Sequence, residues 1–350
     1  MLLSVGTAKG LFVFRSDDSR RRWRRSGPYL KGLEINHAIV DPRSADLFAT
    51  ANSPWFGARM SRSSNNGRTW QESEVKFGDE EQKLDRVWHI EPGRPSEADT
   101  IYLGVAPAAL FRSDDRGESW SEVTGLTEHP SRDRWQPGAG GLCLHSIVLD
   151  PDDTSKMWIG ISAVGVFRTQ DGGDKWETKN AGVRAEFQPE KYPEFGQCVH
   201  HMVRAPSGRL YQQNHCGVYR SDDGGDSWDE ITEGLPSDFG FPMAAHPRDP
   251  DTAYVIPLQG AEFRGPPEGK LRVFRTADSG KSWEPLTKGL PQSGAFMGIY
   301  REGMTADSLD PHGLYFGTNT GNLYASIDEG ESWRRLSAEL PPITSVSVSV

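Results

Sequence analysis

A nine-residue pattern that recurs along the whole chain constrains its fold more than any other feature. The copy RSDDGGDSW at residues 220–228 places acidic residues and glycines before a tryptophan. Four close copies lie at 112–120, 168–176, 275–283 and 325–333, and two degraded copies lie at 15–23 and 62–70. Their final tryptophans lie 47 to 56 residues apart: Trp23, Trp70, Trp120, Trp176, Trp228, Trp283 and Trp333. A period of this length is typical of the four-stranded blade of a β-propeller.

The residues around each copy predict the four strands of one blade. Alternating stretches such as IYLGVAPAALFR (101–112) precede the pattern and read as strands two and three. An apolar strand that ends in a Pro turn, such as HSIVLDP (145–151), comes before them, and a fourth strand starts at the tryptophan. The N-terminus supplies strands two to four (2–6, 11–15 and 22–26), and residues 343–350 supply the missing first strand. We therefore expect an all-β, seven-bladed propeller, closed by pairing of the two ends and forming one domain over residues 1–350.

Composition narrows the classes of partner. The net charge of −10 disfavours nucleic acid, which requires a basic stripe. Apolar runs are too short to span a bilayer, and the first residues read as strands, not as a signal peptide. Three cysteines do not form a disulfide framework, so we expect free thiols in a cytoplasmic protein. Oligomeric state is left open.

The pattern Ser/Thr-x-Asp-x-Gly-x-Ser/Thr-Trp resembles the Asp-box, or BNR, repeat of sialidases, sortilin-like propellers, xyloglucanase-type glycosidases and photosystem-assembly propellers. The resemblance implies a hairpin between strands three and four, on the face opposite the ligand site. It implies that the Asp carboxylate caps its own turn, that the Gly takes a positive φ and that the Trp packs between hairpins. In the degraded copies Asn65 can still make this turn, whereas Arg20 requires another geometry. These roles fall on Asp115, Asp171, Asp223, Asp278 and Asp328, with Gly117, Gly173, Gly225, Gly280 and Gly330. We interpret these acidic turns as structural.

Histidines at the start of the first strands are the strongest candidates for chemistry. Alignment on the Pro turns places His89, His145 and His200 at one position beside the axis, with Asn36 or His37 in the blade before them. One interpretation is that each ring bonds a neighbouring blade. The other is that His89, His145, His200 and His37 bind a divalent transition metal, or that His89, His145 and His200 act as acid/base groups. His201 adjoins the set, and Cys143 and Cys198 could extend it.

Long connections between blades add candidates for substrate contact, since long loops are often functional. The connections at 76–88, 124–144, 180–199 and 288–304 carry aromatic and charged residues suited to a sugar or another small polar ligand. Arg301 and Glu302 join the histidines as predicted catalytic residues. The predicted substrate-binding residues are Arg86, Trp88, Trp135, Trp55, Tyr300 and His215.

Motif tests leave two classes of function. The Arg-Ile-Pro motif of sialidases is absent, and sialidases have six blades. Xyloglucanase-type enzymes form a cleft between two propellers, and the repeats counted here make one. We expect an enzyme, a hydrolase or lyase acting on a small, sugar-related substrate at the axial pocket. The alternative is a non-catalytic scaffold that binds a protein or glycan on the same face.

Overall fold

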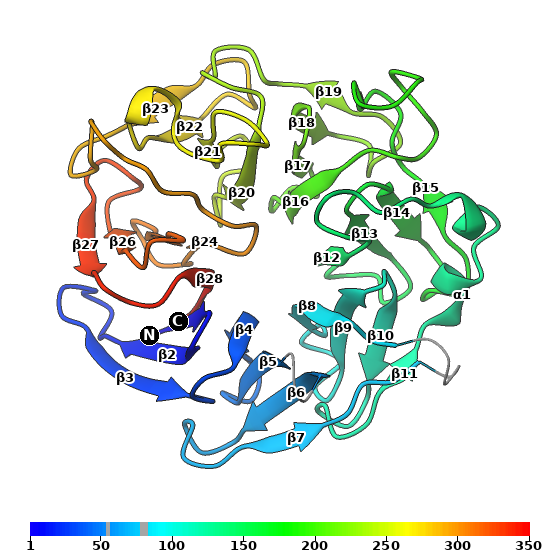
Figure 1. Cartoon of the computed structure of the whole chain (residues 1–350), viewed down its shortest axis with the longest axis horizontal. Coiled ribbons are helices and arrows are strands. Elements are labelled where there is room, and N and C mark those ends of the chain that lie inside the picture. Colours follow the sequence, from blue (N-terminus) through cyan, green and yellow to red (C-terminus); the bar gives the residue numbers. More distant parts are fainter. Residues whose placement is uncertain (54–56, 78–82) are drawn as a thin grey trace.

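The computed structural model describes residues 1–53, 57–77 and 83–350. Seven four-stranded antiparallel sheets surround a central axis (Figure 1), which confirms the predicted seven-bladed propeller. We number the sheets as blades 1 to 7 in chain order. Blade 1 comprises β28 (Ile343–Ser349), β1 (Leu2–Thr7), β2 (Gly10–Arg15) and β3 (Arg24–Tyr29), and blade 2 comprises β4 (Glu34–Val40), β5 (Leu47–Ser53), β6 (Gly57–Ser63) and β7 (Gln71–Ser73). Blade 3 comprises β8 (Arg86–Pro92), β9 (Ile101–Ala106), β10 (Leu110–Ser113) and β11 (Ser121–Glu122), and blade 4 comprises β12 (Leu144–Leu149), β13 (Met157–Ile161), β14 (Gly165–Thr169) and β15 (Glu177–Thr178). Blade 5 comprises β16 (Val199–Arg204), β17 (Leu210–Asn214), β18 (Gly217–Ser221) and β19 (Asp229–Glu230). Blade 6 comprises β20 (Gly240–Ala245), β21 (Ala253–Pro257), β22 (Val273–Thr276) and β23 (Glu284–Leu286). Blade 7 comprises β24 (Met304–Ala306), β25 (Leu314–Gly317), β26 (Leu323–Ser326) and β27 (Arg334–Ser337).

The two ends of the chain share blade 1, as predicted. β28 lies at the axis and pairs antiparallel with β1, with Ser4 opposite Ser347 and Val5 opposite Val346. Figure 1 shows the N- and C-termini side by side in this blade. The first strand at the axis is therefore contributed by residues more than 300 positions from the rest of its sheet.

The hydrophobic core lies between neighbouring blades. Strand two is buried along its whole length in several blades, for example β9 and β13. Phe167 and Trp176 of blade 4 pack with Tyr102 and Leu110 of blade 3 in one buried cluster. Because each sheet buries both faces against its neighbours, its second strand is largely apolar, although β17 (LYQQN) also buries two glutamines and an asparagine.

The acidic turns stabilise their own hairpins, as predicted. Asp223 accepts the backbone N–H of Ser227 at 2.9 Å and its hydroxyl at 2.6 Å, and Gly225 has a φ of +90°. The Trp228 indole N–H donates to the Lys179 carbonyl of the preceding blade at 2.9 Å. The carboxylate and the indole thus fix a turn and join two blades.

The first, degraded copy uses another hydrogen-bond pattern. Its turn is capped by Asp17, which accepts the Ser19 N–H at 3.1 Å and lies one residue earlier in the nine-residue pattern than the capping aspartate of the good copies. Arg20 adopts a φ of +54° at the position of the missing glycine, and its guanidinium forms a buried ion pair with Asp307 at 3.1 Å. The ion pair holds a conformation that a non-glycine residue rarely adopts.

Helical structure is limited to short segments in the described part of the chain. These are α1 (Thr124–Thr127), η1 (Arg132–Arg134) and η2 (Pro267–Gly269). Among the described residues, no helix has the length and apolarity needed to cross a membrane.

Candidate functional site

The register of the first strands corrects the predicted alignment of the histidines. His89 lies opposite Gly104 in β9, but the residue opposite Gly160 in blade 4 is Ser146, and the residue opposite Gln213 in blade 5 is His201. His89 therefore corresponds to Ser146 and His201, and the predicted equivalence of His89 with His145 and His200 is wrong.

The alignment on the prolines failed because, in blade 3, the turn after the first strand has one more residue before its proline than the matching turn of blade 4. Gly93 N–H closes that turn on the Thr100 carbonyl, and Asp150 N–H closes the matching turn of blade 4 on Lys156. Arg94, not Pro95, thus takes the place of Pro151. In blades 2 to 5 the amides that close these turns belong to Asp41, Gly93, Asp150 and Ala205. The residues four positions before them are His37, His89, Ser146 and His201.

Three of these residues converge on Glu302, which precedes β24. Glu302 Oε1 lies 3.0 Å from His89 Nδ1 and 3.9 Å from His201 Nδ1. Glu302 Oε2 lies 3.8 Å from His37 Nε2, and the rings of His37 and His89 stack with centroids 4.7 Å apart. All four side chains are buried. We call His37, His89, His201 and Glu302 the axial cluster.

The charges of the axial cluster follow from its hydrogen bonds. Burial opposes protonation of His89, but Glu302 on one side and Glu91 on the other, 3.3 Å from Nε2, raise its pKa to about 10. Burial would raise the pKa of Glu302, but His89, followed by His37 and His201, lowers it well below the usual range. The axis therefore contains a buried carboxylate–imidazolium pair.

The other two cluster histidines are neutral near neutral pH. Burial lowers the pKa of His37 to about 3 and also lowers that of His201. His37 Nδ1 accepts the Ile90 N–H at 3.0 Å, so Nε2 carries the proton and donates to Ser347 Oγ at 3.1 Å. His37 thus connects blades 1, 2 and 3.

His145 and His200 bond the backbone of the next blade. His145 Nε2 donates to the Val199 carbonyl at 2.9 Å, and His200 Nδ1 donates to the Gly240 carbonyl at 2.5 Å. Each sits at a β-bulge of its strand. Burial lowers the pKa of both rings well below its ordinary value. Their geometry matches the first of the two interpretations drawn from the sequence.

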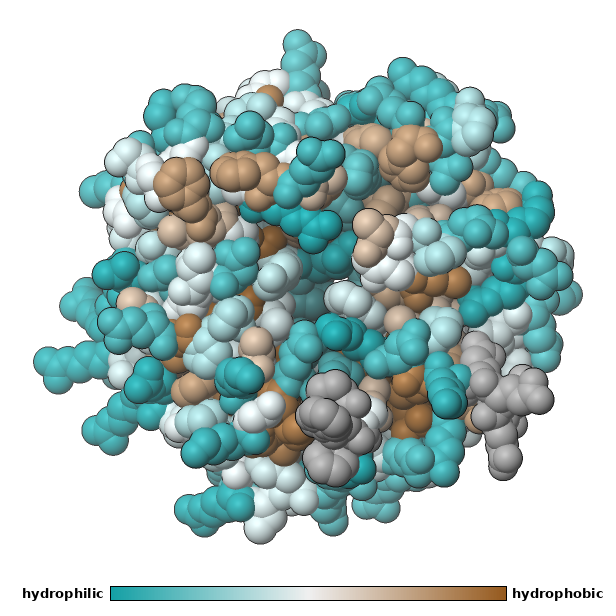
Figure 2. Space-filling model, in the orientation of Figure 1, coloured by the Kyte–Doolittle hydropathy of each residue, from teal (hydrophilic) through white to brown (hydrophobic). Residues whose placement is uncertain are grey.

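Cavities lie on both sides of Glu302. A cavity of about 280 Å³ is lined by Arg86, Trp88, Phe241, Tyr300, Arg301 and Glu302, together with Glu34. A second, of about 450 Å³, runs along the first strands past the three cluster histidines, and Glu302 lines it too. Figure 2 shows the molecule hollowed at its centre, among largely hydrophilic residues. Glu302 lies between the two spaces.

Aromatic and arginine side chains form the wall of the smaller cavity. The Arg301 guanidinium lies over the rings of Phe241 at 4.9 Å and Trp88 at 5.9 Å, and it donates to Ser162 Oγ at 3.2 Å. Arg86 pairs with Glu34 at 2.9 Å and lies 5.5 Å from the Trp88 ring. We call this space the upper cavity.

The predicted substrate-binding residues divide in the structure. Arg86, Trp88 and Tyr300 line the upper cavity, although Arg86 and Trp88 lie in β8 and not in the predicted loop. His215 lines an adjoining cavity of about 400 Å³. Trp135 is a core residue packed on Phe167, so its predicted role as a stacking face is wrong. Trp55 lies outside the described residues.

Sequence reasoning missed Glu91 and Glu34. Glu91 follows His89 by two residues, so it lies on the same face of β8, and this period could have revealed it. Glu34 pairs with Arg86 of the next blade, and no local pattern signals that contact.

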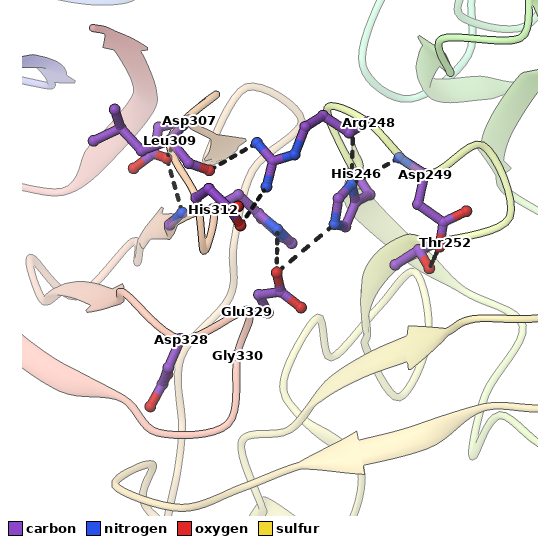
Figure 3. Close-up of polar contacts among 12 residues, drawn as sticks. His246, Arg248, Asp249, Thr252, Asp307, Leu309, His312, Asp328, Glu329 and Gly330 are labelled. Carbon is purple, nitrogen blue, oxygen red and sulfur yellow. Dashed lines mark hydrogen bonds and ion pairs between the residues drawn. The ribbon is translucent and has the colours of Figure 1, made fainter.

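A second histidine cluster joins blades 6 and 7 at their turns. Figure 3 shows His246 and His312 pointing toward Glu329, at 3.9 Å and 3.5 Å. His246 Nδ1 accepts the backbone N–H groups of Arg248 and Asp249 at 3.0 and 2.9 Å. This network connects the turn after β20 to the hairpin after β26.

Comparison with known proteins finds xyloglucanases of similar sequence. It is 21% identical over 328 residues to an oligoxyloglucan-reducing end-specific xyloglucanase of Emericella nidulans, covering 82% of this chain and 38% of that protein. The chain is a seven-bladed β-propeller similar in sequence to part of a xyloglucanase. It thus spans well under half the length of that relative. No protein-family model matches it.

Solved structures show the same fold. A GH74 xyloglucanase from Xanthomonas campestris superimposes with a TM-score of 0.65 at 20% identity, covering 98% of this chain and 52% of that one. YCF48 bound to D1 peptide superimposes with a TM-score of 0.57 at 16% identity, covering 86% of this chain and 80% of that one. At these identities the likeness concerns the architecture of the propeller.

Proposed function

We propose that this chain is a glycoside hydrolase that acts on an oligosaccharide bound in the upper cavity, with Glu302 as its essential carboxylate. The observation that carries the proposal is the position of Glu302, a buried and ionised carboxylate at a cavity lined by aromatic rings and arginines. Sequence similarity to a xyloglucanase supports a glucan-type oligosaccharide as substrate.

The chemistry assigns roles to two carboxyl groups. Glycosidases use an ionised carboxylate and a second carboxyl group on either side of the bond that is cleaved. The His89 imidazolium keeps Glu302 ionised, which suits a base or a nucleophile. Glu34 also lines the upper cavity and is the second carboxyl group in this proposal. The rings of Trp88 and Tyr300 offer stacking faces for sugar rings.

The test uses two carboxylates that share one histidine. Purified protein is incubated with xyloglucan oligosaccharides and with cello-oligosaccharides, and new reducing ends are measured by chromatography. We expect Glu302→Gln to lower turnover by about 10²-fold or more. Glu91→Gln is the matched control, because Glu91 also bonds His89 but lines only the other cavity. We expect it to keep most of the activity.

Two results would overturn this function. The first is the absence of both hydrolysis and saturable oligosaccharide binding in the unmodified protein. The second is a Glu302→Gln variant that turns over as fast as the parent.

A second candidate is a peptide-binding scaffold that uses the same cavity without catalysis. Its support is the structural similarity to YCF48 bound to D1 peptide, whose length the chain nearly matches. Arg86 and Arg301 could then receive a peptide carboxylate. Binding of an acidic peptide that survives Glu302→Gln, with no hydrolysis of any glycan, would favour this candidate.

A further inference from the structure

Three groups of side chains in the described residues bring potential metal ligands within 4.8 Å of one another. They are His37, His89 and Glu302; His246, His312 and Glu329; and Cys198, His200 and His215. A histidine binds a metal through a ring nitrogen that has a lone pair, and its other nitrogen then carries the proton, usually as a donor to a carbonyl or carboxylate. The hydrogen bonds of each ring therefore decide which group can bind a metal.

The first two groups fail this criterion. His37 Nδ1 and His246 Nδ1 both accept backbone N–H groups, which leaves the proton on the nitrogen that would have to bind the metal. Both nitrogens of His89 face carboxylates. The Glu302 carboxylate already accepts a hydrogen bond from His89, and the Glu329 carboxylate lies 3.9 Å from the protonated Nε2 of His246.

The third group meets the criterion. His200 Nδ1 donates to the Gly240 carbonyl, so Nε2 keeps its lone pair. Within the described residues, neither ring nitrogen of His215 and no part of the Cys198 thiol has a hydrogen-bond partner, and the thiol is not in a disulfide.

We propose that Cys198, His200 and His215 bind one thiophilic transition-metal ion, Zn²⁺ or Cu⁺. One thiolate and two imidazoles are ligands that both ions accept in proteins. Cys198 precedes β16, His200 lies within it, and His215 is in the two-residue turn between β17 and β18. All three line the cavity of about 400 Å³ beside the upper cavity, so a further coordination position is open to a small ligand.

The surroundings favour the ion of lower charge. Two guanidinium groups, of Arg264 and Arg301, and one carboxylate, of Glu262, line the same cavity, and both guanidinium groups lie over the Phe241 ring, at 5.4 and 4.9 Å. With one thiolate and two neutral imidazoles, a Cu⁺ complex is neutral, whereas a Zn²⁺ complex keeps one positive charge. We therefore expect Cu⁺ to bind more tightly than Zn²⁺.

Blade 4 supplies a natural control with the same backbone but an incomplete ligand set. Ser162 N–H donates to the Cys143 carbonyl as His215 N–H donates to the Cys198 carbonyl, each at 2.9 Å. Cys143 thus matches Cys198, but Ser162 occupies the place of His215. His145, which matches His200, uses Nε2 for the Val199 carbonyl and Nδ1 for the Ser146 hydroxyl.

The test is a metal titration that does not depend on hydrolytic activity. Protein purified without a His-tag and stripped with chelator is titrated with Co²⁺, with Zn²⁺ and, under reducing anaerobic conditions, with Cu⁺. We expect one ion per chain and a thiolate-to-cobalt charge-transfer band. Cys198→Ser should abolish that band, and Cys198→Ser and His215→Ser should each weaken binding of the favoured ion about tenfold or more. Cys143→Ser should change neither.

Thermal unfolding separates loss of the site from loss of the fold. Stripped His215→Ser protein should still fold and should unfold slightly below the stripped parent, because His215 lies in a partly buried turn and its ring packs against Phe187, His200 and Phe239. Added metal should raise the unfolding temperature of the parent and of Cys143→Ser, but not that of His215→Ser. The proposal is overturned if no ion binds stoichiometrically, or if Cys143→Ser loses as much affinity as Cys198→Ser. It is also overturned if the metal stabilises His215→Ser as much as the parent. None of these outcomes bears on hydrolysis.

Discussion

The first strands of the blades carry two rows of histidines that lie one position apart and have different roles. His145 and His200 form the first row, and His37, His89 and His201 form the second. His145 and His200 sit at β-bulges and donate to the backbone of the next blade. His37, His89 and His201, each matching the position one residue further along its strand, reach the axis and surround Glu302. Because neighbouring strand residues point to opposite faces, one residue separates a bond between blades from a charged centre.

The largest expected effect comes from removing the carboxylate at which the second row converges. Glu302→Leu leaves the His89 imidazolium with Glu91 as its remaining partner. Breaking a buried ion pair from one side typically costs about 3 kcal/mol, so we expect a loss of that size in the free energy of unfolding. Urea denaturation measures it. A loss below about 1 kcal/mol would show that the axial cluster is not the charged centre described here.

Replacing His145, the first-row residue outside the proposed metal site, should cost less and act mainly on stability. His145→Leu leaves the buried Val199 carbonyl without its donor, which costs about 2 kcal/mol. His145 also lines the upper cavity, but it does not contact Glu302, so oligosaccharide hydrolysis per folded molecule should fall far less than in Glu302→Gln, as measured by activity normalised to the folded fraction. If the turnover of His145→Leu falls as far as that of Glu302→Gln, the division between the two rows is wrong.

The pH dependence of stability sharpens the comparison further. The pKa of His89 is raised from 6.5 to about 10, so its stabilising contribution is fully present below pH 6.5 and is lost as the pH rises toward 10. The pKa of Glu302 is lowered from 4.5, so its contribution is present above pH 4.5 and is lost as the pH falls. The gap in unfolding free energy between the parent and His89→Gln should therefore be widest between about pH 5 and 6.5 and should narrow toward pH 10.

Ring nitrogen shifts in NMR spectra test the same charge assignment directly. Near pH 8, His89 should show the imidazolium pattern, while His37 and His201 show neutral rings. A neutral His89 at that pH would contradict the ion pair.

The smallest effect is expected from a carboxylate outside both rows. Asp223→Ala removes the acceptor for the Ser227 N–H and hydroxyl at the solvent-exposed end of a hairpin. We expect a loss of about 1 kcal/mol in the free energy of unfolding and no change in oligosaccharide hydrolysis. Loss of hydrolysis in this variant would mean that the acidic turns are more than structural.

The sequence was sufficient for the fold because each blade repeats its own local signals. The tryptophans marked seven hairpins, and the unpaired strand at residues 343–350 identified the closure. The site was harder to predict. An extra residue before Pro95 moved the alignment by one position, so His145 and His200 were matched to His89 in place of Ser146 and His201. A turn length depends on hydrogen bonds such as Gly93 to Thr100, which no repeat pattern encodes.

Glu302 was named from its loop, but its role as the point of convergence could not be derived from sequence. Its partners come from blades 2, 3 and 5, and it enters from the connection between blades 6 and 7. Only closure of the ring brings these elements together.

The shared blade has a consequence for the order in which the chain is made. β1, β2 and β3 emerge from the ribosome before the other strands of the propeller, but the strand that completes their sheet, β28, follows them by more than 300 residues. While the intervening residues are synthesised, β1 therefore presents an unpaired edge, the kind of surface that promotes association between chains. The hydrogen bond between His37 and Ser347 also cannot form until β28 has been synthesised. We expect the newborn chain to depend on factors that shield this edge until synthesis reaches β28.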